Sequence, residues 1–91
     1  MSEVVARDAV VHGRVQGVFF RASCQDEAQA LGVRGWVSNA ADGTVRAHLE
    51  GTAEDVEAMV EWLHQGPRHA MVERVDVRDV PPQEPEGFEV R

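Results

Sequence analysis

Apolar and polar positions follow two different periods along this chain, and the change of period separates strands from helices. From Val4 to His12, β-branched residues and Ala alternate irregularly with charged residues, which predicts a first strand. From about Arg21 the apolar spacing lengthens to that of a helix, with Gly32 placed to end it. The buried stripe of this helix is formed by Phe20, Cys24, Ala28 and Leu31.

A predicted hairpin follows the first helix. Residues 33–39, "VRGWVSN", alternate like a strand, with Val33, Gly35, Val37 and Asn39 on one face. Residues 40–43, "AADG", form a short turn in which Gly43 supplies a positive φ. In residues 44–50, "TVRAHLE", we expect two opposite faces. The inward face has Val45, Ala47 and Leu49, and the outward face has Arg46, His48 and Glu50.

The second half of the chain repeats the order of helix and strand. Thr52 begins a helix that has Asp55 at the capping-box position, and Gly66-Pro67 ends it. Its buried stripe consists of Val56, Met59, Val60 and Leu63. Residues 70–80 predict a fourth strand, in which the irregular spacing of the valines suggests a bulge. After the extended spacer "PPQEPEG", residues 88–91 predict a short fifth strand at the edge.

The predicted order is therefore βαββαβ with a small C-terminal extra, in one domain spanning residues 1–91. Each helix has a single apolar stripe, so both can lie on one face of the sheet. We expect a ferredoxin-like α+β sandwich of two layers, with an antiparallel sheet of four to five strands.

Composition and charge limit the kinds of partner. The 91 residues are 43% apolar and 27% charged, with a net charge of −7. That sign disfavours nucleic acid, but a local cluster of donors can still bind a small anion because screening acts over roughly 8 Å. No apolar run approaches the ~20 residues of a membrane span. With Cys24 as its single cysteine and no signal-peptide pattern, we expect a cytoplasmic protein.

The segment 13–21, "GRVQGVFFR", leads into the first helix without a capping residue. None of Ser, Thr, Asp or Asn occurs between His12 and Ser23, so the first amides of the helix lack a side-chain acceptor. We expect Gly13 and Gly17 to turn these amides inward and to leave room for a ligand. Arg21 can then close a site for an oxyanion such as phosphate. The alternative is an ordinary glycine turn beside a surface arginine.

Asn39 is the second candidate. It ends its strand on the face assigned to the helices, where a polar amide needs a partner. That partner is either the main chain of the following turn or a ligand at the rim of the sheet. Periodicity alone does not join Asn39 to the glycine segment.

"GRVQGVFFR", followed some twenty residues later by "GWVSNAADGTV", resembles the two signature motifs of the acylphosphatase family. The likeness extends over almost the whole chain, although this chain stops at Arg91 where the family often ends in an aromatic residue. The resemblance implies hydrolysis of small acyl phosphates without a metal. We also expect a monomer that needs no other cofactor. The resemblance assigns the catalytic roles to Arg21, which holds the phosphate, and to Asn39, which positions the attacking water. The phosphate-binding residues that it implies are Val15, Gln16, Gly17, Val18, Phe19, Phe20 and Arg21.

Two other functions are alternatives to this enzyme. One is an acylphosphatase-like module that binds phosphate or carbamoyl phosphate without independent turnover. The other is a ferredoxin-like RNA binder, which the absence of Tyr and the negative charge disfavour. We expect His12 to be structural, Cys24 to be a core residue, and Trp36 and Trp62 to serve in packing. The four histidines show no spacing typical of metal ligands.

Overall fold

A computed structural model describes residues 3–91 of the chain. Its elements follow the predicted order, with boundaries that differ by a few residues: the first strand continues to Arg14 and the first helix begins at Phe20. The strands are β1 (Val4–Arg14), β2 (Arg34–Asn39), β3 (Val45–Thr52), β4 (Met71–Asp79) and β5 (Phe88–Val90), and the helices are α1 (Phe20–Leu31) and α2 (Ala53–Gln65).

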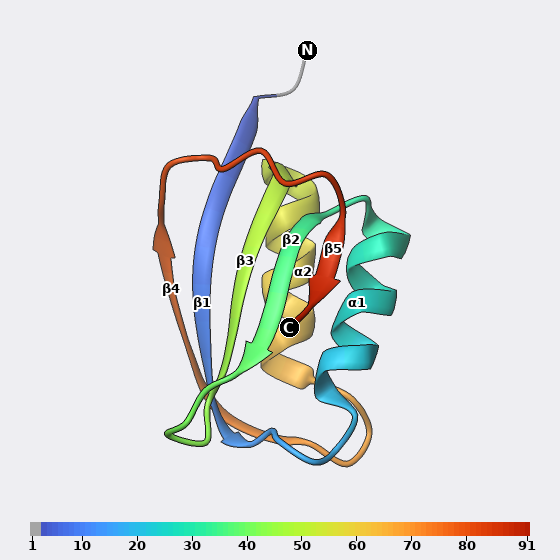
Figure 1. Ribbon diagram of the computed structural model, residues 1–91, viewed down its shortest axis with the longest axis vertical. Coiled ribbons are helices and arrows are strands. Elements are labelled where there is room, and N and C mark those ends of the chain that lie inside the picture. The colour runs from blue at the N-terminus through green and yellow to red at the C-terminus, as the bar shows by residue number, and fades with distance from the viewer. Residues whose placement is uncertain (1–2) are drawn as a thin grey trace.

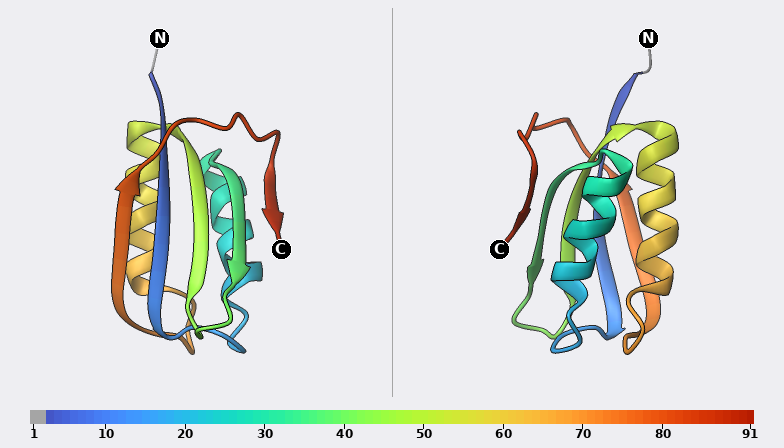
Figure 2. Two further views of the ribbon diagram at one scale, coloured as in Figure 1. Left: turned by 60° about the vertical axis from the view of Figure 1, so that its left-hand side comes forward. Right: turned by 90° about the vertical axis from the view of Figure 1, so that its right-hand side faces the viewer.

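The strands form one sheet in the order β4-β1-β3-β2-β5, and both helices cover the same face of it (Figures 1 and 2). This arrangement confirms the ferredoxin-like α+β sandwich. One detail differs, because β5 pairs with β2 in parallel and makes the sheet mixed. Residues 80–87, here called the strap, cross at the end of the sheet where β4 finishes (Figure 1). The chain therefore enters β5 in the direction opposite to β4, which is the direction of β2.

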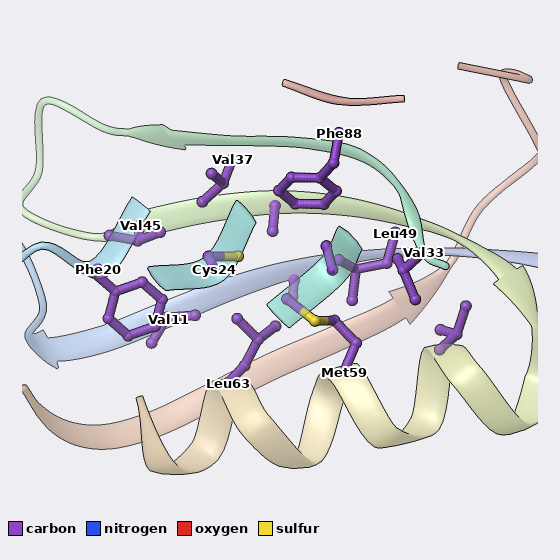
Figure 3. Packing of buried hydrophobic residues seen from close by; sticks show 14 of the residues in the cluster. Val11, Phe20, Cys24, Val33, Val37, Val45, Leu49, Met59, Leu63 and Phe88 are labelled. Carbon is purple, nitrogen blue, oxygen red and sulfur yellow. The ribbon is translucent and has the colours of Figure 1, made fainter. Parts of the chain in front are cut away.

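The core lies between the sheet and the two helices. Figure 3 shows Phe20 and Cys24 of α1 facing Met59 and Leu63 of α2, and strand residues such as Leu49 belong to the same cluster. The predicted stripes are confirmed, although Leu31 and Val60 are only partly buried. Burial raises the pKa of the Cys24 thiol to about 12, so the thiol stays protonated and behaves as a core group.

The opposite face of the sheet corrects one expectation. His48 and Glu50 point away from the helices as predicted, yet both side chains are completely buried instead of exposed. His48 bridges two carboxylates, with Nδ1 2.6 Å from Asp8 Oδ1 and Nε2 2.5 Å from Glu50 Oε2. Trp36 stacks over the imidazole with 6.2 Å between ring centroids. Buried polar groups are thus paired on this face instead of being hydrated.

The strap explains why Glu50 is buried. Its carboxylate accepts hydrogen bonds from the main-chain N–H groups of Gln83 at 2.6 Å and Glu84 at 3.1 Å. Burial by itself would raise the pKa of Glu50, but the hydrogen bonds from His48, Gln83 and Glu84 lower it below its ordinary value. The strap is therefore fastened to β3, the middle strand of the sheet, a few residues before β5 begins.

The bulge predicted in the fourth strand is confirmed, because Glu73 of β4 has no residue opposite it in β1. The pairing of β1 with β4 shifts register between His12 and Gly13, and Gly13 pairs with Val72. Gly13 has a φ of 128°, and a Cβ at this position would collide with the main-chain oxygen of Met71. The expectation that Gly13 leaves room for a ligand is therefore wrong. This glycine is required because two strands approach closely.

Candidate functional site

A cavity of about 310 Å³ joins the two segments that periodicity left apart. It lies where the loop after β1 enters α1, beside the end of β2 and the short strand β5. The residues that line it are Val15, Gly17, Phe19, Phe20, Arg21, Ala22, Asn39 and Val90. Both predicted catalytic residues, Arg21 and Asn39, thus face one shared space.

The entry into α1 is built without a side-chain cap. Phe19 occupies the N-cap position in the left-handed region, with φ 61° and ψ 25°, and makes no capping hydrogen bond through its side chain. Gly17, in the loop just before it, has a φ of 74°. A Cβ on Gly17 would meet open space, so the backbone conformation and not crowding favours glycine here. The first amides of α1 therefore stay available to an acceptor from outside the helix.

Arg21 supplies the positive charge of the site. It belongs to the first turn of α1 and is half-buried, and its Nη1 donates a hydrogen bond to the main-chain oxygen of Arg91 at 2.8 Å. A guanidinium has five N–H donors, so this contact leaves others for an anion. The positive end of the helix dipole lies at the same place. Arg14 is exposed and lies outside the cavity lining.

Asn39 stands at the rim of the cavity as the exposed last residue of β2. The turn that follows has its own side-chain acceptor, Asp42, whose Oδ1 accepts from the main-chain N–H of Thr44 at 3.0 Å and from its hydroxyl at 2.6 Å. The turn is therefore braced by Asp42. These contacts come from Asp42, whereas Asn39 lines the cavity.

Gln16 links the two motifs in a way that the sequence did not indicate. Its Nε2 donates to the main-chain oxygens of Ala40 at 2.8 Å and Thr44 at 2.9 Å. These two bonds tie the loop after β1 to the β2–β3 hairpin and so bring Arg21 and Asn39 to the same cavity. A glutamine between two loop residues has no sequence pattern that would reveal such a contact.

The predicted phosphate-binding segment divides into two groups. Five of its residues line the cavity: Val15, Gly17, Phe19, Phe20 and Arg21. The side chain of Gln16 turns to the hairpin, and Val18 packs against the core, so neither lines the cavity. Two residues that the sequence analysis did not select, Ala22 and Val90, complete the lining.

The remaining candidates lie elsewhere. His12 Nε2 is 2.9 Å from Asp76 Oδ2 in a contact between β1 and β4, outside the cavity lining. Trp62 packs edge-on against Phe20, with 5.4 Å between ring centroids. Within residues 3–91, no group of three or more His, Cys, Asp or Glu side chains gathers as a possible metal site. No helix in the described part of the chain is both long and apolar enough to cross a membrane.

This arrangement is suited to binding a small oxyanion. Uncapped helix amides, the helix dipole and a guanidinium provide hydrogen-bond donors and positive charge around one cavity. The carboxamide at the rim can orient a polar molecule beside the anion.

Comparison with known proteins agrees with this geometry. The family model described as acylphosphatase matches residues 7–90. A curated acylphosphatase from Nocardioides sp. (strain ATCC BAA-499 / JS614) is 56% identical over 86 residues, which cover 94% of this chain and 87% of that protein. The structure of an acylphosphatase from Coxiella burnetii superposes with a TM-score of 0.94 at 34% identity, covering 97% of this chain and 93% of the other.

A third match places the same fold in a larger protein. The structure of full-length HypF in its phosphate- and nucleotide-bound form covers 100% of this chain, with a TM-score of 0.92 and 28% identity, but only 12% of HypF itself is matched. The motifs, the two-layer fold, the family model and the curated relative agree with one another, and the chain belongs to the acylphosphatase family.

Proposed function

We propose that this chain hydrolyses small acyl phosphates to a carboxylate and inorganic phosphate, with Arg21 and the amides of residues 15–21 holding the phosphate and Asn39 orienting the attacking water. One observation carries the proposal. The uncapped start of α1, the Arg21 guanidinium and the Asn39 carboxamide share one cavity. Membership of the acylphosphatase family supports a hydrolase built on these parts.

The chemistry of the substrate fits such a site. The leaving group of an acyl phosphate is a carboxylate, which is already a stable anion above a pH of about 5, so departure needs little help from a general acid. The barrier then lies in aligning the water and in stabilising charge on the equatorial phosphate oxygens. Fixed amides and a guanidinium serve the second purpose.

The water needs a partner that orients it and an acceptor for its proton. The carbonyl oxygen of Asn39 can accept a hydrogen bond from the water. This contact orients the water so that a lone pair of the water oxygen points at phosphorus. A carboxamide is too weak a base to remove the proton. We assign that proton to an oxygen of the bound phosphate, which becomes part of the released inorganic phosphate.

The alternative is a module that binds phosphate or carbamoyl phosphate without turnover, and the match within the much larger HypF keeps it in view. Such a module needs the donors at Arg21 but has no need for a water-orienting group. Asn39 on the rim of the same cavity therefore favours the enzyme.

The test separates the two catalytic roles. Arg21→Ala removes a charged contact to phosphate, and we expect it to weaken phosphate binding and nearly abolish turnover. Asn39→Ala keeps the donors, so phosphate affinity should stay within a few-fold while turnover falls roughly a hundredfold. Calorimetric titration with phosphate and kinetics with benzoyl phosphate measure the two effects. Arg14→Ala, at an exposed arginine outside the cavity, is the matched control.

Two outcomes contradict the proposal once circular dichroism and melting show that the variants are folded. Near wild-type turnover by Asn39→Ala would show that Asn39 does not orient the attacking water. Normal phosphate binding by Arg21→Ala removes the phosphate-holding role. A wild-type chain that binds phosphate but releases none from benzoyl phosphate is the binding module.

The proposed enzyme is a metal-independent, cytoplasmic monomer in which residues 1–91 work as one domain. The reaction as written uses only this chain's own donors, and the free thiol of Cys24 is buried in the core. Turnover in the presence of a chelator tests the metal independence. The mass from light scattering tests the monomeric state. Loss of activity in chelator with recovery in Mg²⁺ or Zn²⁺ contradicts the metal-free mechanism.

A further inference from the structure

Phe19 combines two unfavourable features in one residue. Its φ of 61° lies in the left-handed region, where a bulky side chain costs on the order of 1 kcal/mol or more. Its side chain is also exposed, with a relative exposure of 82% for the residue, the highest among the large apolar residues that are exposed. A strained backbone that holds an aromatic ring in water calls for a use outside the folded core.

The neighbouring residues show that the core does not require this ring. Phe20 fills the core, at 2% exposure, and packs against Trp62. Among the described residues other than glycine, Phe19 shares a positive φ only with Glu84, whereas Gly17 and Gly32 adopt a similar φ without strain. Phe19 is therefore neither needed for packing nor suited to its own backbone conformation.

The place of Phe19 indicates what the ring does. Phe19 and Val90, itself 39% exposed, line the same cavity as Arg21 and Asn39. The cavity volume of about 310 Å³ falls at the lower end of the range of small-molecule pockets, ~300–1,000 Å³, so the site has room for more than a phosphate. The lining of this cavity therefore includes both a donor for an anion, Arg21, and the exposed apolar side chains of Phe19 and Val90.

We propose that Phe19 and Val90 form an apolar shelf that binds the acyl group of the substrate, so that the enzyme favours acyl phosphates with an aromatic or branched apolar group over acetyl phosphate. This proposal rests on the function proposed above. A substrate held by its phosphate must project its acyl group out of the amides, toward the remaining lining of the cavity. Phe19 is then a specificity-determining residue whose ring contacts the part of the substrate that does not react.

The first experiment compares two substrates in four proteins. The ratio of kcat/KM for benzoyl phosphate to kcat/KM for acetyl phosphate is measured in the wild type, Phe19→Ala, Phe19→Trp and Met71→Ala. Any disturbance of the phosphate site affects both substrates, so the ratio isolates the contact with the acyl group. We expect the ratio to fall on the order of tenfold in Phe19→Ala and to persist in Phe19→Trp. Met71→Ala, at an exposed apolar residue outside the cavity lining, should leave it unchanged.

A second measurement does not depend on turnover. Benzylphosphonate and methylphosphonate share an anionic head and differ in the apolar group, so the ratio of their calorimetric affinities reports the shelf directly. We expect the wild type to prefer benzylphosphonate and Phe19→Ala to lose most of that preference.

The two proposals fail in distinguishable ways. An unchanged substrate ratio and unchanged phosphonate ratio in folded Phe19→Ala overturn the shelf and leave the roles of Arg21 and Asn39 standing. A wild type without preference for benzylphosphonate also overturns it. Full turnover in Arg21→Ala overturns the proposed function instead, whatever the phosphonates show.

Discussion

The two helices of this fold begin in opposite ways. At α2, the Thr52 hydroxyl accepts the main-chain N–H of Asp55 at 3.1 Å, and Glu54 and Asp55 place carboxylates in the first turn. At α1, Phe19 offers no side-chain cap, and within the described chain the first turn of α1 contains no acidic residue. The two halves of the chain repeat the same order of elements, so α2 serves as an internal reference for α1.

The difference shows where this chain reserves positive charge. In α2, Thr52 satisfies the Asp55 amide, and the carboxylates of Glu54 and Asp55 oppose the positive end of the helix dipole. Helix α1 leaves its amides open and adds the Arg21 guanidinium beside them. A protein with a net charge of −7 can thus keep one local site that attracts anions.

The largest effect on activity is expected when α1 is given a carboxylate in its first turn, as α2 has. Ala22 is the third residue of α1, as Asp55 is of α2, and it lines the cavity. We expect Ala22→Asp to lower kcat/KM on the order of a hundredfold, because a fixed carboxylate competes with phosphate for the same donors. The same change should stabilise the fold by about 0.3–1 kcal/mol.

Acyl phosphate kinetics and thermal melting check both effects on one sample. Ala22→Asn, which is neutral and of similar size, is the control. Wild-type kcat/KM in folded Ala22→Asp would show that the open amides do not serve the substrate.

Phosphate itself should act as the missing cap of α1. At ten times its dissociation constant, a ligand bound only by the folded state stabilises that state by about 1.4 kcal/mol. This corresponds to a rise in Tm of about 6–10 °C for a domain of this size. Melting in phosphate against chloride of equal ionic strength measures it, and Arg21→Ala should lose the shift. An equal shift in chloride would mean that phosphate acts only through ionic strength.

Gln16 fastens the loop that precedes α1 from outside the helix. Removing its two hydrogen bonds to the hairpin in Gln16→Ala should cost about 1 kcal/mol of stability. Because the loop and Asn39 then lose their common anchor, we expect turnover to fall about fivefold. Chemical denaturation and kinetics are the measurements, with Gln29→Ala on the exposed side of α1 as the control. Turnover that stays at the wild-type level would show that the hydrogen bonds of Gln16 to the hairpin are not needed for catalysis.

The smallest effect belongs to the helix that caps itself. Thr52→Ala removes the acceptor of the Asp55 amide and should destabilise the fold by about 0.5–1 kcal/mol without changing kcat/KM. Thr52→Ser retains the hydroxyl and should restore most of that stability. A marked loss of turnover in Thr52→Ala would show that the start of α2 affects the site. Helix α2 could then no longer serve as an independent reference for α1.

Much of this structure could be predicted because the periodicity of the sequence reports directly on burial. The stripes of Phe20, Cys24 and Ala28 and of Val56, Met59 and Leu63 placed both helices on one face of the sheet. The missing cap before α1 is visible in the sequence as the absence of Ser, Thr, Asp and Asn from "GRVQGVFFR".

The parts that escaped prediction depend on contacts between residues far apart in the chain. Alternation placed His48 and Glu50 away from the helices, but no local pattern shows that the strap binds Glu50 or that Asp8 and Trp36 contact His48. Likewise, Gln16 reaches Ala40 and Thr44, 24 and 28 residues away. The sequence suggests a ligand beside Gly13, but the group that excludes a side chain there is the main chain of Met71. Met71 lies in another strand, so no local pattern reveals this contact.

The short strand β5 also determines how this chain behaves toward copies of itself. Without it, β2 would be the edge of the sheet, with unpaired main-chain groups that offer a template for aggregation. Gly35 N–H donates to Gly87 O and Arg91 N–H donates to Val37 O, each at 2.8 Å, so β5 occupies that template. The other edge, β4, is guarded by the exposed charges of Glu73, Arg74, Asp76, Arg78 and Asp79. The Glu50 carboxylate holds the strap, and the strap leads into β5, which covers the edge of β2. Glu50 thus helps to prevent strand pairing between copies of the chain, although it lies outside that edge.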